Sequence, residues 1–77
     1  MASMHDFYLA RAEASRILAA DAVLDNVRQR HLASEHAWSD LADRAGRVDT
    51  MRAQLMVTKA AERAAAALAE AELEPAA

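Results

Sequence analysis

Apolar side chains recur along the first half of the chain at alternating spacings of three and four, the repeat of one helix face. The row runs through Ile17, Ala20, Leu24, Val27, His31, Ser34, Trp38, Leu41, Ala45 and Val48. Continued in phase, the row meets Arg52, Leu55, Lys59 and Glu62, so it ends. A second row begins two residues out of phase, at Val57, Ala61, Ala64, Leu68 and Ala71. The change of phase predicts two helices with a break near Gly46.

Gly46 is the only glycine, and Pro75 is the only proline. Glycine adopts left-handed dihedrals without steric cost, so Gly46 is expected to end the first helix. Asp49 or Thr50 could cap the second. The prediction is an all-α, two-helix antiparallel hairpin with a long first helix, in one domain, 1–77. The expected boundaries are a first helix at about 4–45, a turn at about 46–49, a second helix at about 50–73 and a frayed tail at 74–77. The alternative is one helix of about 70 residues that bends at Gly46, where glycine costs about 1 kcal/mol relative to alanine.

A hairpin folded near Gly46 leaves the N-terminal part of its first helix without a partner. That helix would be about 60 Å long, and the second would cover little more than half of it. Because exposed apolar patches mark interfaces, we expect self-association, as a homodimer that forms a four-helix bundle with coiled-coil-like packing. An unrelated protein bound to the overhang is the alternative. The expected contact residues are Phe7, Tyr8, Ile17, Leu24, Asn26, Val27 and Trp38.

Two of these contact residues have further expected roles. Trp38 is the one large aromatic residue of the first row, and such a residue usually anchors a core. Asn26 either fixes helix register through an interhelical hydrogen bond, as buried asparagine does in coiled coils, or is simply exposed.

Alanine accounts for much of the 55% hydrophobic content, so the potential core is small. The chain has no cysteine and a net charge of -3, from 12 acidic and 9 basic residues. No apolar run approaches the roughly 20 residues of a membrane span, and the N-terminus does not resemble a secretory signal. A cytoplasmic protein without a membrane partner is therefore expected. Either Met1 or Met4 could be the natural start.

Four polar residues offer metal-binding chemistry: His31, Glu35, His36 and Asp40. His31 and Glu35 share a helix face, as do His36 and Asp40, but the two histidines are five positions apart and point in different directions. We expect no metal and no cofactor; His31 would be half-buried and His36 solvated. A site shared across a dimer by His31, Glu35 and His36 is the remaining metal hypothesis.

No catalytic pattern is present, because the chain lacks cysteine and a single glycine cannot build a phosphate-binding loop. The sequence therefore favours a non-enzymatic adaptor or small regulatory protein that binds itself. The alternative is a nucleic-acid-associated regulator that uses Arg44, Arg47 and Arg52 at the turn of a dimer. Nucleic acid is the weaker hypothesis, since these arginines equally suit the negative end of a helix dipole.

Three segments carry a resemblance: Tyr8-Leu-Ala-Arg-Ala-Glu, Leu24-Asp-Asn-Val-Arg-Gln-Arg30 and Ser34-Glu-His-Ala-Trp-Ser-Asp-Leu-Ala-Asp-Arg44. Through these segments the chain resembles a group of short, uncharacterised helical proteins of alphaproteobacteria. The resemblance implies a helical fold in a bacterial cytoplasm and brings no established activity. It also implies interface roles for Asp25, Asn26, Arg28, Arg30 and Trp38.

Overall fold

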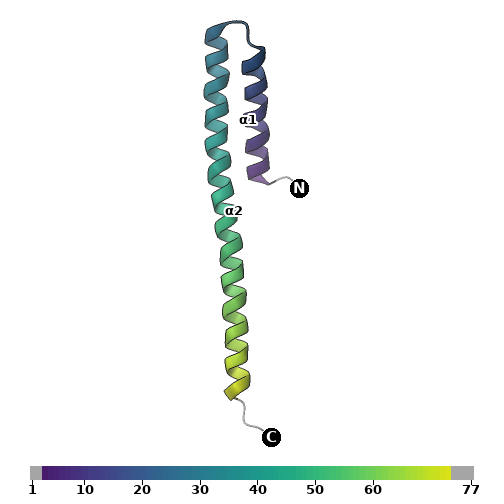
Figure 1. Cartoon of the computed structure of the whole chain (residues 1–77), viewed down its shortest axis with the longest axis vertical. Coiled ribbons are helices and arrows are strands. Elements are labelled where there is room, and N and C mark those ends of the chain that lie inside the picture. The colour runs from purple at the N-terminus through teal and green to yellow at the C-terminus, as the bar shows by residue number, and fades with distance from the viewer. Residues whose placement is uncertain (1–2, 74–77) are drawn as a thin grey trace.

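A computed structural model describes residues 3–73, which form two antiparallel helices joined by a short turn. Helix α1 spans Met4–Asp21 and helix α2 spans Asp25–Leu73. Helix α1 lies beside the first part of α2, and the rest of α2 continues alone (Figure 1). The molecule extends 82 Å along its long axis and 19 by 11 Å across it. The predicted all-α class and two-helix hairpin are therefore confirmed.

The predicted position of the turn is wrong. The chain reverses at residues 22–24, so the first helix is the short one, and residues 46–49 lie inside α2. Gly46 has no positive φ and does not end a helix. A single glycine inside a helix costs only about 1 kcal/mol, which packing against a neighbouring helix can offset. The predicted frayed tail, 74–77, lies outside the described residues.

Aspartates on both sides of the turn favour a break there. In an unbroken helix Asp21 and Asp25 would be one turn apart, where like charges repel. The break instead places Asp25 in the first turn of α2, where a carboxylate interacts favourably with the helix dipole. The Arg28 guanidinium donates to the Ala22 carbonyl at 3.1 Å and lies 3.4 Å from Asp25 Oδ1. Arg28 thereby links the end of α1 to the start of α2.

Local contacts also stabilise α1. The Ser3 hydroxyl caps its N-terminus by accepting a hydrogen bond from the Asp6 backbone N–H at 3.1 Å. Arg16 donates from Nε to Glu13 Oε2 at 2.8 Å, and this hydrogen bond lowers the pKa of Glu13 and raises the pKa of Arg16. Because the pKa of Glu13 is lowered, this contribution is present at neutral pH and is lost when acid protonates the carboxylate.

The two helices meet through small side chains. Ala12, Ser15 and Ala19 are the buried residues of α1, and Ala42, at 1% exposure, is the buried residue of α2. Within residues 3–73 no large side chain is fully buried. Small residues allow close approach of the helices but remove little apolar surface from water. The hairpin therefore has a thin core.

Gly46 contributes to this close approach at the open end of the hairpin. A Cβ at Gly46 would lie 3.3 Å from His5 Cδ2. The His5 ring belongs to the second residue of α1 and occupies the space that a side chain at position 46 would use.

Replacing Gly46 by alanine is expected to stabilise the hairpin slightly. Alanine favours the helix by about 1 kcal/mol relative to glycine. Part of this gain is lost because the half-buried His5 ring must shift by a few tenths of an ångström to make room for the new Cβ. We expect a net gain of about 0.5 kcal/mol, seen as a rise in melting temperature of about 2–4 °C. In a His5→Ala background the same change should give the full gain. A lower melting temperature for Gly46→Ala alone would mean that His5 cannot move.

Candidate interaction surface

An aromatic cluster fastens α1 to α2 near the open end of the hairpin. Tyr8 stacks on Trp38 with ring centroids 6.0 Å apart and an interplanar angle of 29°. Phe7 meets Trp38 edge-on at 6.1 Å and 90°. The Arg11 guanidinium carbon lies 5.1 Å from the centroid of the Trp38 ring, in a cation–π contact. Trp38, itself half-buried, is therefore the point at which three residues of α1 converge.

The predicted N-terminal overhang is wrong. Phe7 and Tyr8 were expected to lack an internal partner, but both pack on Trp38 because the turn at residues 22–24 folds α1 back on α2. The same fold leaves Ile17 47% exposed, on the outer side of α1. Of the predicted contact set, Phe7, Tyr8 and Trp38 come together, while Ile17 lies apart from them.

The remaining predicted contact residues lie around the turn. Leu24 is 63% exposed, and Val27 is half-buried. Asn26 is exposed in the first turn of α2 and forms no interhelical side-chain hydrogen bond among residues 3–73. These side chains form no continuous surface with the aromatic cluster at the other end of the hairpin.

The uncovered part of α2 is the main feature that the sequence pattern missed. Every residue from 47 to 73 is exposed, and residues 51–73 are called the arm below. The arm carries large apolar side chains that are each more than half exposed. They are Met51, Leu55, Met56, Val57, Leu68 and Leu73. Five of the positions in the second predicted row belong to the arm, and none is buried.

One side of the arm continues the side of α2 on which α1 lies. Positions three and four apart share a helix face. Starting from Ala42 and Gly46, which lie against α1, such steps pass through Thr50 and along the arm. The uncharged arm positions on or beside this line, called the arm face, are Ala53, Val57, Ala60, Ala61, Ala64, Ala67, Leu68 and Ala71. Arg63 lies at its edge, three positions after Ala60 and four before Ala67. The arm face therefore continues the edge of the α1 contact formed by Ala42 and Gly46, whereas the row of Val27, Trp38 and Ala45 continues in phase to Arg52 and Lys59.

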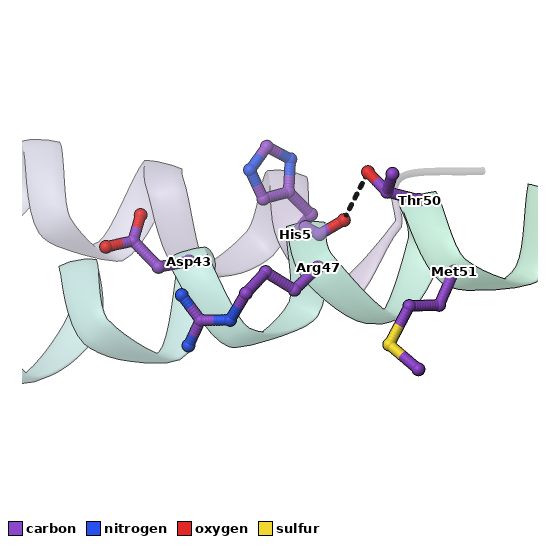
Figure 2. A pocket seen from close by; sticks show the side chains of 6 residues that line it. His5, Asp43, Arg47, Thr50 and Met51 are labelled. Carbon is purple, nitrogen blue, oxygen red and sulfur yellow. Dashed lines mark hydrogen bonds between the residues drawn. The ribbon is translucent and has the colours of Figure 1, made fainter.

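Two shallow grooves flank the point where α1 begins. One is formed by His5 of α1 and by α2 residues that include Asp43, Arg47 and Met51 (Figure 2). Its Thr50 hydroxyl donates to the Gly46 carbonyl at 3.0 Å, a bond within α2. The groove on the other side includes Met4, Tyr8, Val48 and Arg52.

The arginines of the nucleic-acid hypothesis lie near these grooves. Arg44, Arg47 and Arg52 are exposed along an unbroken helix, with Asp43 and Asp49 among them. The turn that was expected to present them is absent, since α2 is continuous through these residues. The nucleic-acid hypothesis therefore loses the turn on which it was based.

The histidines occupy the environments expected for them. His31 is half-buried, and His36 is exposed with Nε2 3.7 Å from Asp40 Oδ2. Glu35 is half-buried on the side nearer α1. Within residues 3–73 no group of three or more histidine and carboxylate side chains is arranged to hold a metal ion.

Comparisons with known proteins assign no family to the chain. No protein-family model, curated protein or solved structure matches it. Neither described helix has a stretch long and apolar enough to cross a membrane. The arm face and the charges beside it are therefore the basis for a functional proposal.

Proposed function

We propose that this chain is a non-enzymatic helical interaction protein, an adaptor or small regulatory subunit, that self-associates through the arm face. The observation that carries the proposal is the uncovered arm, in which every residue is exposed. Helices in proteins gain most of their stability from packing an apolar face. A second copy offers each arm such a partner.

The thin core of the hairpin supports the same proposal. Small proteins without a large core commonly depend on a disulfide, a metal or a second copy. This chain has no cysteine, and residues 3–73 hold no candidate metal cluster. Self-association would bury further apolar surface without either of them.

A four-helix bundle is a second packing for the homodimer. It would bury the outer side of α1, where Ile17 and Leu18 are 47% and 51% exposed. That side is short, because α1 ends at Asp21. The arm face is longer, so we assign the contact to the arm.

Sedimentation of two matched double variants tests the proposal. Val57→Glu with Leu68→Glu places charges on the arm face, and Ile17→Glu with Leu18→Glu places them on the outer side of α1. Glutamate is a good helix former, so helicity should persist in both. The arm variant is expected to sediment as a monomer and the α1 variant as the wild-type dimer. A monomeric wild type would overturn self-association, and the reverse pattern would move the contact to α1.

A further inference from the structure

We infer that a groove along one side of α2 binds an acidic amphipathic helix of a partner protein. The groove, called the basic groove below, begins beside the start of α1 and continues along the first half of the arm. Val57 and Leu68 of the arm face lie on the opposite side of α2, so binding in this groove is independent of self-association through the arm face. Three cationic and three apolar side chains form the basic groove: Val48, Arg52, Leu55, Met56, Lys59 and Arg63.

The basic groove consists of three adjoining shallow hollows. The first reaches α1 at Tyr8 and shares Val48 and Arg52 with the second. The second shares Leu55 with the third, which extends to Arg63. From Val48 to Arg63 the groove is about 22 Å long, which corresponds to about four turns of a helix.

The basic groove continues the contact between α1 and α2. Trp38 and Ala45 belong to the row of α2 that packs against α1, and the same spacing of three and four leads on to Arg52 and Lys59. Helix α1 begins at Met4, and among the described residues no other segment covers this row beyond that point (Figure 1). A second helix placed end to end with α1 would therefore lie in the basic groove.

The charge of the basic groove selects an acidic helix. Arg52, Lys59 and Arg63 are exposed and form no ion pair within residues 3–73. Lys59 and Arg63 are one helical turn apart, and Arg52 lies two turns before Lys59. Glu62 is the only acidic residue between positions 50 and 69, and it does not line the groove. Carboxylates at matching spacings on a facing helix would meet all three cations.

The apolar half of the basic groove favours a protein over a nucleic acid or a lipid surface. Val48, Leu55 and Met56 are 45%, 56% and 73% exposed, and apolar side chains of a partner would remove this surface from water. A phosphate backbone offers no such apolar surface. Recognition of lipid headgroups uses clusters of about four to eight basic residues. Cations interleaved with apolar side chains instead match an amphipathic helix bound in a groove.

Binding of labelled peptides to the full chain, followed by fluorescence anisotropy, tests the inference. The probe is a helical peptide of about 20 residues, with leucines along one side and glutamates beside them at spacings of one and two turns. Two matched peptides carry glutamine or lysine in place of glutamate. Three exposed ion pairs together predict that the chain binds the glutamate peptide about tenfold more tightly than the glutamine peptide.

Two charge-reversed variants locate the binding. Arg52→Glu with Lys59→Glu changes the basic groove, and Arg30→Glu with Arg47→Glu makes the same change of net charge at exposed positions outside it. Glutamate is a good helix former, so helicity should persist in both. The groove variant is expected to lose its preference for the glutamate peptide and to bind the lysine peptide more tightly than the wild type does. The control variant should bind all three peptides as the wild type does.

Four other outcomes would overturn the inference. One is equal affinity of the wild type for the glutamate and glutamine peptides, and another is an equal loss of binding in the two variants. Tighter binding to phosphatidylglycerol vesicles or duplex DNA than to the glutamate peptide, lost in the groove variant, would assign the groove to a lipid surface or a nucleic acid. A groove variant that sediments differently from the wild type would place the groove within the self-association contact.

Discussion

Gly46→Pro is expected to destabilise the protein by about 3 kcal/mol or more, whereas Val23→Pro should be tolerated. Position 46 lies in the interior of α2. Proline there removes the backbone N–H that bonds to the Ala42 carbonyl, and its ring clashes with that carbonyl. The resulting kink would also displace the His5 contact at the open end of the hairpin.

Val23 is the matched control, since it lies in the turn and is 91% exposed. The residue before it, Ala22, has φ -69° and ψ 131°, a conformation that suits a residue preceding proline. Thermal unfolding followed by circular dichroism compares the two variants. Equal losses of stability, or a larger loss for Val23→Pro, would contradict the placement of the turn at residues 22–24.

Trp38→Ala is expected to release α1 from α2. The change removes the stacked contact with Tyr8, the edge contact with Phe7 and the cation–π contact with Arg11. A buried tryptophan truncated to alanine costs about 3–5 kcal/mol, and the half-burial of Trp38 places its cost nearer about 2 kcal/mol. Such a loss is a large share of the stability of a hairpin with so thin a core.

Hydrogen exchange measured residue by residue gives the readout for Trp38→Ala. Amides of α1 should lose protection, because a detached helix of 18 residues is marginal in water. Trp38→Phe retains an aromatic ring against Tyr8 and should keep most of the protection. Unchanged exchange in α1 of the alanine variant would show that the aromatic cluster does not hold the hairpin together.

The rows of apolar positions predicted two antiparallel helices correctly, but neither where these helices end nor which segments pack together. Val27, Trp38 and Ala45 of the first row are half-buried, as a packed face requires. They pack against α1, however, and not against the second row, which is exposed throughout. Two rows with the same alternating spacing match in mirror image at many offsets, so the pattern could not determine which segment folds back.

The turn was predictable only from signals weaker than a glycine. The place of Asp25 in the first turn of α2 and the hydrogen bond from Arg28 to the Ala22 carbonyl both require the helix break at residues 22–24. No glycine or proline marks this break in the sequence. Gly46 was the stronger signal for a helix break. In the structure, however, its lack of a side chain leaves room for the His5 ring. Trp38 packs on Phe7 and Tyr8, and neither this contact nor the exposed arm could be predicted without the position of the turn.

The continuity of α2 couples the arm to the hairpin although no contact joins them. Starting a helix costs free energy that adding further residues to an existing helix does not. The turns of α2 held by α1 supply this nucleus, and the arm extends it by propagation. Release of α1 would therefore let the arm melt as well. By the same linkage, a second copy bound to the arm would slow the opening of α1 at the other end of the molecule.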